Sequence, residues 1–283
     1  MVDRDRSAGW SYAKKSGHQN ETNIFNLLKN DLEFKESLEF ILKSNIKDFN
    51  IGGLNEKSVV SVFNKSLTKS KTDLKIISDN RTFNFSIKKS RGGQVYLITI
   101  PRFINGIKKQ FDINLNTNEL KAINLFFGED SQEVNRIIDS KVTLAVNQKI
   151  KSYERRKSRL TLKSIALYDN EMPKVLLNFF KKNCMEVFLF CFSRGLAIEE
   201  NDWAKYLWYM NTIKDEGDSK INKIFEIEKL ASKIKDSDLY EFGKRNGGTT
   251  IQLPFGFVQW HQGQIQFHHN YEKVCNLNSS HKR

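Results

Sequence analysis

KTDLKIISDNRTFNFSIKKSRGGQVYLI, residues 71–98, contains the clearest structural signal in the chain. Two short runs rich in Ile, Phe and Thr flank the turn-forming cluster Ser78-Asp79-Asn80-Arg81, and this arrangement predicts a β-hairpin. Successive side chains of a strand point to opposite faces. The second strand of the hairpin therefore has an apolar face, formed by Phe83, Phe85 and Ile87.

The other face of this strand is polar. Asn84, Ser86 and Lys88 lie on it, and Asp73 stands near the start of the partner strand. A carboxylate, a small hydroxyl and an ammonium group on one side of a hairpin are an unusual combination in a sheet. An ordinary amphipathic hairpin with a solvated polar face is the alternative interpretation of the same residues.

The succession of Asp73 and Ser86-Ile87-Lys88 resembles the core motif of the PD-(D/E)XK nucleases, particularly that of type II restriction endonucleases. The step Gly92-Gly93-Gln94, which follows the lysine, is similar to a step in some of those enzymes. The sequence departs from the family pattern at two positions. Ser86 replaces an acidic residue, and Thr72 rather than a proline precedes Asp73.

The resemblance implies an α/β fold with a mixed central β-sheet flanked by helices and a C-terminal β-rich extension. It also implies site-specific, Mg²⁺-dependent cleavage of double-stranded DNA that leaves 5′-phosphate and 3′-hydroxyl ends. In that activity Asp73 would bind the metal, Ser86 would be a weaker neutral ligand, and Lys88 would orient the attacking water. A homodimer, a cognate DNA methyltransferase in the same system and a bacterial cytoplasmic location follow from the same resemblance.

Another candidate site residue lies on an amphipathic helix predicted over residues 18–29. Ile24, Phe25 and Leu28 form the inward face of this helix, and helical spacing places Glu21 towards the same face. An inward carboxylate needs a partner. The resemblance makes that partner the metal ion, whereas a capping or salt-bridged glutamate at a helix start is the alternative.

The composition favours an anionic partner. The 283 residues include 46 Lys and Arg against 33 Asp and Glu, which gives a formal charge of +13 and a pI near 9.5. This balance favours nucleic acid first and a membrane surface second, although an AT-rich genome also produces proteins rich in Lys and Asn.

No apolar run approaches the roughly 18 residues of a membrane span, and no signal peptide is expected. Cys184, Cys191 and Cys275 fit reduced thiols in a cytosolic protein better than a disulfide framework or a zinc site.

Two basic segments are candidates for contacts with DNA phosphates, which lysine and arginine neutralise without regard to base sequence. Residues 1–17 look like a mobile or DNA-ordered arm, which carries Lys14 and Lys15. Residues 149–159, KIKSYERRKSR, include Arg155 and Arg156. A solvated helix face is the alternative for the second segment.

Residues 245–271, RNGGTTIQLPFGFVQWHQGQIQFHHNY, have few charged side chains and many glutamines, and Gly and Pro divide them into three short strands. Alternation places Gln264 and Gln266 on one face and Ile265 and Phe267 on the other. Glutamine on a strand can enter the major groove and pair with adenine. The candidate DNA-contacting residues are Gln94, Arg245, Asn246, Gln252, Gln259, Gln264 and Gln266. A β-meander with a polar outer face, which only completes the fold, is the alternative.

The remaining patterns predict further elements. Helices are expected over residues 31–50, 57–63 and much of 117–185, with Pro173 near the start of one of them. A strand from Val95 should stop at Pro101, with Gln94 near Lys88 if the two strands are neighbours. Residues 186–192 predict a buried strand, and the aromatic residues between 199 and 236 have a helical spacing typical of a core or a dimer interface. The chain divides into an arm (1–17), a catalytic core (18–110) and a part for DNA recognition and dimerisation (111–283), the last two within one compact domain.

Two other functions fit the same sequence. A non-catalytic DNA-binding protein needs only the basic charge and the glutamine-rich strands, and Ser86 in place of a carboxylate favours it. A nuclease of related fold that acts on branched DNA or on a repair intermediate would keep the site and change the substrate.

Overall fold

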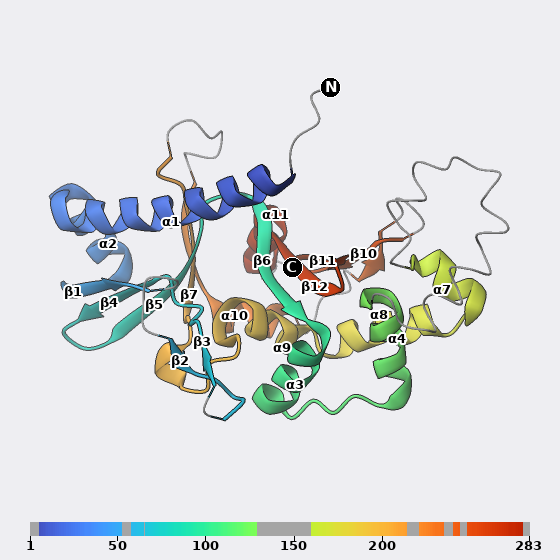
Figure 1. Cartoon of the computed structure of the whole chain (residues 1–283). Coiled ribbons are helices and arrows are strands. Elements are labelled where there is room, and N and C mark those ends of the chain that lie inside the picture. Colours follow the sequence, from blue (N-terminus) through green and yellow to red (C-terminus); the bar gives the residue numbers. More distant parts are fainter. Residues whose placement is uncertain are drawn as a thin grey trace, which may run out of the picture. The chain divides into compact units, whose positions relative to one another are not determined.

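The computed structural model (Figure 1) describes residues 6–52, 58–64, 66–128, 160–213, 221–234, 240–243 and 248–279, with the backbone alone for residues 6–16. The chain forms two compact units. One combines residues 1–91 and 192–230, and the other combines residues 92–191 and 231–283. Neither unit is continuous in the sequence, whereas the sequence patterns suggested divisions after residues 17 and 110.

The first unit contains a mixed five-stranded sheet in the order β1-β4-β5-β7-β8. Its strands are β1 (Ile46–Ile51), β4 (Leu74–Ser78), β5 (Thr82–Lys88), β7 (Tyr206–Met210) and β8 (Asn222–Glu226). β5 and β7 are parallel, and the other neighbouring pairs are antiparallel. The helices α1 (Arg6–Asn30) and α2 (Leu32–Leu42), blue in Figure 1, lie over this sheet. The unit also holds a small sheet of β2 (Val59–Val60) and β3 (Leu67–Thr68) and the helical turn η3 (Glu200–Asp202).

One apolar core joins α1 and α2 to the sheet. Phe83, Phe85 and Ile87 of β5 are at most 6% exposed, and they belong to one cluster with Ile24 and Leu28 of α1. The apolar face predicted for the second strand of the hairpin is therefore confirmed. Burial of aromatic and aliphatic side chains on this scale supplies the main force that holds the helices on the sheet.

The hairpin of β4 and β5 is also confirmed. The backbone N–H and the hydroxyl of Ser78 both donate to the carbonyl oxygen of Arg81, at 3.0 and 2.9 Å. The Arg81 guanidinium in turn donates to the carbonyl oxygen of Leu42 in α2, at 3.0 Å. The polar face of β5 is not solvated, because Asn84 and Ser86 are 3% and 2% exposed. The interpretation as an ordinary hairpin with a solvated polar face is therefore wrong.

The second unit contains an antiparallel sheet in the order β6-β12-β11-β10-β9. The strands are β6 (Gly92–Thr99), β9 (Glu241–Phe242), β10 (Thr250–Leu253), β11 (Gly256–His261) and β12 (Gln264–Asn270). The helices of this unit are α3 (Ile100–Phe111), α4 (Thr117–Phe127), α7 (Leu162–Tyr168), α8 (Met172–Lys182), α9 (Cys184–Leu189) and α11 (Tyr271–Ser279). The π-helical η2 (Phe190–Arg194) and α10 (Ile227–Ile234) span two of the three points where the chain passes between the units.

Helices cover one face of this second sheet. The Phe267 ring of β12 lies 5.6 Å from the Phe103 ring of α3 and 6.4 Å from the Phe180 ring of α8, centroid to centroid. The predicted mixed central sheet with flanking helices is thus confirmed in the first unit, and the predicted β-rich C-terminal part is present in the second. Among the described helices, none combines the length and the apolar character that crossing a bilayer requires.

Several smaller predictions are confirmed. β6 ends before Pro101, which occupies the first turn of α3. Pro173 has the same place in α8, because proline fits the first helical turn, where its missing N–H has no partner to lose. The three C-terminal strands appear as β10, β11 and β12.

Other elements differ from the prediction in their limits. α1 begins at Arg6 and not near residue 18, so residues 6–17 are helical. Gly and Ser each cost only about 1 kcal/mol or less in a helix. α2 ends at Leu42 because Lys43 adopts a left-handed conformation with φ of 52°. Residues 46–51 then pair with β4, so a single helix over 31–50 is wrong. The predicted helix at 57–63 is wrong as well, since Val59 and Val60 form β2.

Two apolar segments have the opposite structure from the predicted one. Residues 186–192 are helical, within α9 and η2, because a run that is apolar at every position has no periodicity to separate a buried helix from a buried strand. The aromatic segment around Trp208 is strand β7 and not a helix. Its prediction as core is confirmed, since Trp208 is 1% exposed.

Gly52 allows the end of β1 to approach the segment before β4. Its N–H donates to the carbonyl oxygen of Asp73 at 2.9 Å, and a Cβ at this position would lie 2.1 Å from the carbonyl oxygen of Thr72.

Gly52→Ala is therefore expected to destabilise the protein by about 1–3 kcal/mol, as overpacking does, and thermal unfolding measures the loss. At Gly17 an added Cβ meets nothing within 4 Å, so Gly17→Ala is the matched control and should stabilise α1 by up to about 1 kcal/mol. Equal melting temperatures for the two variants would contradict this account.

Candidate active site

The register of β4 and β5 places Asp73 beside Ser86. Leu74 is paired with Phe85, so the residues one step outward, Asp73 and Ser86, lie opposite each other on the other face of the hairpin. The Ser86 hydroxyl lies 3.4 Å from Asp73 Oδ2 and donates to it, and the backbone N–H of Ile87 donates to the same oxygen at 2.7 Å. The strand therefore fixes the carboxylate through a backbone group as well as a side chain.

Lys88 completes this cluster. Its Nζ donates to Ser86 Oγ at 2.8 Å and to the carbonyl oxygen of Ile87 at 2.9 Å, and it lies 3.7 Å from Asp73 Oδ2. The side chains of Lys88 and Asp73 are only 15% and 19% exposed. Water screens such a pair much less than a pair on the surface, so the ammonium and the carboxylate influence each other and any bound ligand strongly.

Asp73 has one carboxylate oxygen left for a ligand. Its contacts with Ser86, Ile87 and Lys88 all involve Oδ2. In the part of the chain that the structure describes, no hydrogen bond or ion pair is formed by Asp73 Oδ1. The carboxylate is thus held by one oxygen and presents the other.

Asn20 attaches α1 to the end of β7. It is 1% exposed, its Nδ2 donates to the carbonyl oxygen of Met210 at 2.9 Å, and its Oδ1 accepts from the backbone and the hydroxyl of Thr212 at 2.8 and 2.9 Å. Tyr209 is paired with Lys88 across β7 and β5. Asn20 therefore brings the next helix residue, Glu21, to the end of the sheet where Lys88 lies.

Glu21 is electrostatically linked to the cluster. Burial, reinforced by the Asp73 carboxylate and only partly offset by the Lys88 ammonium, raises the pKa of Glu21 to about 8. The side chain is 16% exposed, and its Oε2 lies 3.4 Å from Nδ1 of His18. The predicted inward orientation is confirmed. Of the alternative, a capping or salt-bridged glutamate at a helix start, the helix-start position is wrong because Glu21 lies well inside α1, whereas the contact with His18 is a pairing of the salt-bridge kind.

Asp73 and Glu21 offer the kind of oxygen ligand that Mg²⁺ prefers. Mg²⁺ prefers oxygen ligands and commonly uses one or two protein carboxylates, with waters and substrate phosphate as the other ligands. Asp73 Oδ1 and the Glu21 carboxylate are the available donors. Among the described residues no group of three or more His, Cys, Asp and Glu could hold a metal ion, so the site would rely on water and phosphate to complete the coordination.

The predicted DNA-contacting residues have different outcomes. The structure brings Gln94, Gln259 and Gln266 together in the second unit, where their amides are hydrogen-bonded in series. β6 pairs with β12 and not with β5, so the strands of Gln94 and Lys88 are not neighbours in one sheet. Arg155, Arg156, Arg245 and Asn246 lie outside the described residues, as do the side chains of Lys14 and Lys15.

Asn20 is the residue that the sequence analysis missed. It stands four positions before Ile24, on the inward stripe of α1, so a polar residue at an apolar position was the available signal. Its partners, Met210 and Thr212, are some 190 positions away in the sequence. Nothing local to α1 could identify them.

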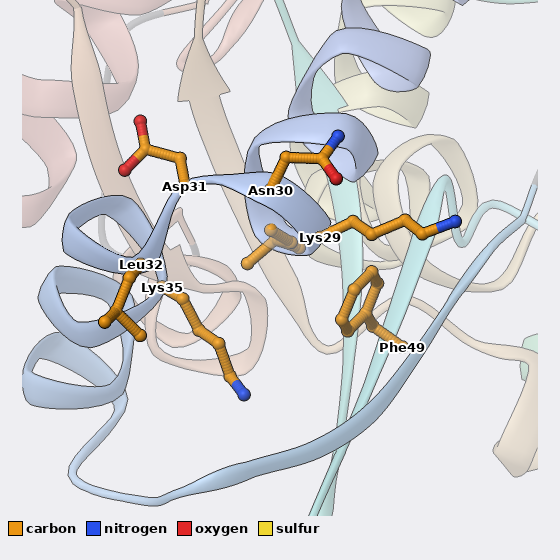
Figure 2. A pocket seen from close by; sticks show the side chains of 7 residues that line it. Lys29, Asn30, Asp31, Leu32, Lys35 and Phe49 are labelled. Carbon is orange, nitrogen blue, oxygen red and sulfur yellow. The ribbon is translucent and has the colours of Figure 1, made fainter.

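A separate pocket lies at the corner between α1 and α2. Figure 2 shows it, lined by Leu28, Lys29, Asn30, Asp31, Leu32, Lys35 and Phe49, with a volume of about 370 Å³. Asp31 caps the start of α2 there, accepting from the N–H of Phe34 at 3.0 Å. The residues of the Asp73 cluster do not line this pocket.

Asn20→Ala tests the attachment of α1. The change leaves backbone groups of Met210 and Thr212 without their partner, so it should destabilise the protein by about 3 kcal/mol and displace Glu21 from the cluster. The pKa of Glu21 should then fall towards its ordinary value, which carboxyl-selective NMR titration would detect. Gln19→Ala, at an exposed neighbouring position, is the control. Unchanged stability and an unchanged Glu21 titration in Asn20→Ala would overturn this assignment.

Comparisons with known proteins give little beyond this geometry. No protein-family model matches the chain, and no curated protein matches it. Among solved structures, the chain is similar to the crystal structure of the restriction endonuclease MspI in complex with its cognate DNA. The TM-score is 0.45 and the sequence identity 11%, over 88% of this chain and 83% of that one. The site is therefore interpreted from its own contacts.

Proposed function

We propose that the chain is a Mg²⁺-dependent endonuclease that cuts double-stranded DNA at a short specific sequence and leaves 5′-phosphate and 3′-hydroxyl ends. The observation that carries this proposal is the half-buried cluster in which Lys88 and Asp73 are fixed by β5, within electrostatic range of the Glu21 carboxyl. Two carboxylates and one lysine are the groups that phosphodiester hydrolysis with a divalent cation needs.

Asp73 and Glu21 would hold Mg²⁺, which when bound lowers the pKa of a coordinated water and neutralises charge on the scissile phosphate. Asp73 is preorganised for this because the Ile87 N–H and Lys88 fix its Oδ2. Glu21 is protonated at pH 7 in the metal-free protein, so it would release a proton on binding the cation and then supply the second negative charge from α1. Asn20 anchors α1 at the end of β7 and so keeps Glu21 of the helix near the cluster on β5.

Lys88 has one donor left for the substrate. An ammonium group has three N–H donors, and Ser86 Oγ and the Ile87 carbonyl oxygen accept two of them. The third can donate to the attacking water or to a phosphate oxygen as negative charge develops there. Donors fixed in advance at such a position typically contribute about 10²–10³ in rate.

Ser86 acts on the lysine in this proposal. Its hydroxyl accepts from Lys88 and donates towards Asp73, so it links the two charged groups and limits the rotation of the lysine side chain. A carboxylate at this position would hold the ammonium in a tighter ion pair. The negative charge missing from position 86 is the charge that Glu21 provides.

The proposed activity has implications for partners. Cutting both strands of a palindromic site is most simply achieved by a two-fold homodimer, and a cell that holds such an enzyme needs a cognate DNA methyltransferase to protect its own sites. The excess of 46 Lys and Arg over 33 Asp and Glu supports binding to the phosphate backbone.

The direct test is incubation of the purified protein with phage-sized duplex DNA, with Mg²⁺ in one sample and EDTA in the other. Discrete fragments in the Mg²⁺ sample alone are expected. DNA that is retarded but uncut in both samples, across substrates of diverse sequence, would refute the nuclease.

A non-catalytic DNA-binding protein is the second candidate, and Ser86 in place of a carboxylate favours it. In that case the wild type would not cut DNA, and Asp73→Ala and Lys88→Ala would bind DNA without any change in cleavage. A nuclease specific for branched DNA would leave linear duplex intact and cut a four-way junction in the same assay.

A further inference from the structure

Three glutamines form a row across the second sheet. Gln259 of β11 donates from Nε2 to Gln266 Oε1 of β12 at 2.7 Å, and Gln266 donates from Nε2 to Gln94 Oε1 of β6 at 2.6 Å. We call these three residues the amide row. Gln259 and Gln266 are directly paired in the register of β11 and β12, so the row runs at right angles to the strands.

A β-bulge brings Gln94 into this row. The pairing of β6 and β12 shifts between Phe267 and His268: Phe267 is paired with Tyr96, and His268 with Gln94. Val95 is the extra residue. Simple alternation would place Gln94 on the face of Tyr96, which packs its ring 5.3 Å from Phe190 among the helices. The extra residue turns Gln94 to the opposite face, and a bulge of this kind commonly redirects a side chain at a functional site.

The face that carries the row is rich in hydrogen-bonding groups, and its charged groups lie around Gln252, which is paired with Glu241 and accepts from Lys273 Nζ at 3.0 Å. No Asp, Glu, Lys or Arg occurs between Arg245 and Glu272, and Gln252 and Gln264 lie on the same side of their strands as the row. The surrounding unit is basic, since its residues include 23 Lys and Arg against 14 Asp and Glu, or +9 of the chain's +13. A neutral row of amides within a basic unit complements a nucleic acid, whose phosphates are charged and whose base edges are neutral.

His268 extends the row without adding charge. Its ring stacks on Phe257 at 4.3 Å between centroids, and its Nε2 lies 3.4 Å from Gln259 Nε2. Burial, with a smaller contribution from His261, lowers the pKa of His268 to about 4. The neutral ring can then accept from Gln259 at Nε2, which occupies both N–H groups of that amide.

The row has a donor end and an acceptor end. Gln266 uses its oxygen and one N–H within the row, and Gln259 uses its nitrogen. Among the described residues no further partner is found for Gln259 Oε1 or for Gln94 Nε2. Gln94 therefore offers donors, and Gln259 offers an acceptor, two strand spacings or about 10 Å apart.

We propose that this face contacts base edges in the major groove of duplex DNA, with the amide row as the specificity-determining element; the proposal rests on the DNA substrate proposed above. The major groove is about 12 Å wide and accepts β-strands. Gln94 would donate to an acceptor edge, guanine or thymine, and Gln259 would accept from the amino group of cytosine or adenine. Bidentate pairing of Gln259 or Gln266 with adenine, which the sequence alone suggested, is disfavoured because the row already uses their amides.

The test is selection of bound duplexes from a random pool in EDTA, where no cleavage occurs, followed by sequencing. The wild type should enrich one motif. Gln94→Ala should relax one position of that motif and Gln259→Ala another, each by about 5- to 100-fold in discrimination, the range for single base contacts. Binding to unrelated duplex, measured by fluorescence anisotropy, should change by no more than about twofold, because backbone contacts supply non-specific affinity.

Gln19→Ala is the matched control, since Gln19 is an exposed glutamine of α1. Gln266→Leu, which interrupts the row at its centre, should relax both positions; if that variant does not fold, the two end variants still decide. A motif that is identical in the wild type, Gln94→Ala and Gln259→Ala would overturn the proposal, as would a wild type that enriches no motif. A wild type that enriches a motif but never cuts DNA would refute the nuclease and leave this inference standing. Cleavage by Gln94→Ala and Gln259→Ala at the same sites as the wild type would support the nuclease and overturn this inference.

Discussion

Lys88→Ala is expected to lower Mg²⁺-dependent DNA cleavage by a factor of about 10³ or more, because it removes the donor that we propose acts at the scissile phosphate. DNA affinity in EDTA should change by less than about threefold, since one cation contributes little to a binding energy that is shared among many phosphate contacts. The reason for the contrast is the position of the ammonium, which two acceptors on its own strand, Ser86 Oγ and the Ile87 carbonyl oxygen, hold in place.

Asp73→Asn should lower the rate of DNA cleavage by a similar factor, for a different physical reason. The amide keeps the shape of the side chain and loses the charge that holds the cation. Single-turnover cleavage with saturating enzyme measures both rates, and anisotropy with labelled duplex measures both affinities. Higher Mg²⁺ or Mn²⁺ should partly restore Asp73→Asn and should not restore Lys88→Ala.

Lys89→Ala is the matched control, because it removes the same charge one position beyond β5. Its cleavage rate should stay within about threefold of the wild type, because alternation places Lys89 on the strand face opposite to Lys88 and away from the Asp73 cluster. Equal losses in Lys88→Ala and Lys89→Ala would show that the lysines act through overall charge. The Asp73 cluster would then not be the reacting centre.

Glu21→Gln is expected to remove most of the pH dependence of cation binding. With a pKa of about 8, Glu21 is protonated at pH 7 in the metal-free protein, so a cation must displace a proton. Affinity for the cation should therefore rise about tenfold per pH unit below pH 8 and level off above it. Calorimetric titration with Mn²⁺ at pH 7, in two buffers of different ionisation enthalpy, should detect release of about one proton in the wild type and almost none in Glu21→Gln.

The same residue affects stability with a defined sign. The folded pKa of about 8 lies above the ordinary pKa of 4.5 for this side chain, so the unfolded chain releases its proton first as the pH rises. Folding stability of the metal-free protein should decline through this group between pH 4.5 and pH 8. Glu21→Gln lacks this decline, so its melting temperature should exceed that of the wild type increasingly over this range, by roughly 2–4 °C for each kcal/mol.

Glu36→Gln provides the control, since Glu36 is exposed on α2. Proton release and the pH profile of this variant should match those of the wild type. Identical proton release in the wild type and Glu21→Gln would remove Glu21 from the cation site and leave Asp73 as its single carboxylate. That result would also weaken the nuclease proposal, because Ser86 adds no charge.

The two variants test different halves of the site. Lys88→Ala tests chemistry at the phosphate, and its readout is the rate of cleavage. Glu21→Gln tests cation binding, and its readout needs no DNA. A loss in the first with no change in the second would point to a cation held by Asp73 with water and phosphate alone.

Local sequence determined the hairpin and the core of the candidate site. A four-residue turn fixes the pairing of its two strands, and alternation then places Asp73, Ser86 and Lys88 on one face, so their proximity follows from residues within one short segment. Helical periodicity likewise determined the inward direction of Glu21. In each case the deciding interactions lie within a few residues of one another.

Tertiary structure decided what depends on distant partners. The apolar run at 186–192 is a helix because of what surrounds it, and Asn20 is an anchor because β7 ends beside it. β6 follows the hairpin in sequence, yet it pairs with β12 across some 170 residues, and the bulge at Val95 turns Gln94 into the amide row. Sheet pairing and bulges depend on which strands meet in the folded chain, and a single sequence shows alternation without showing the partner.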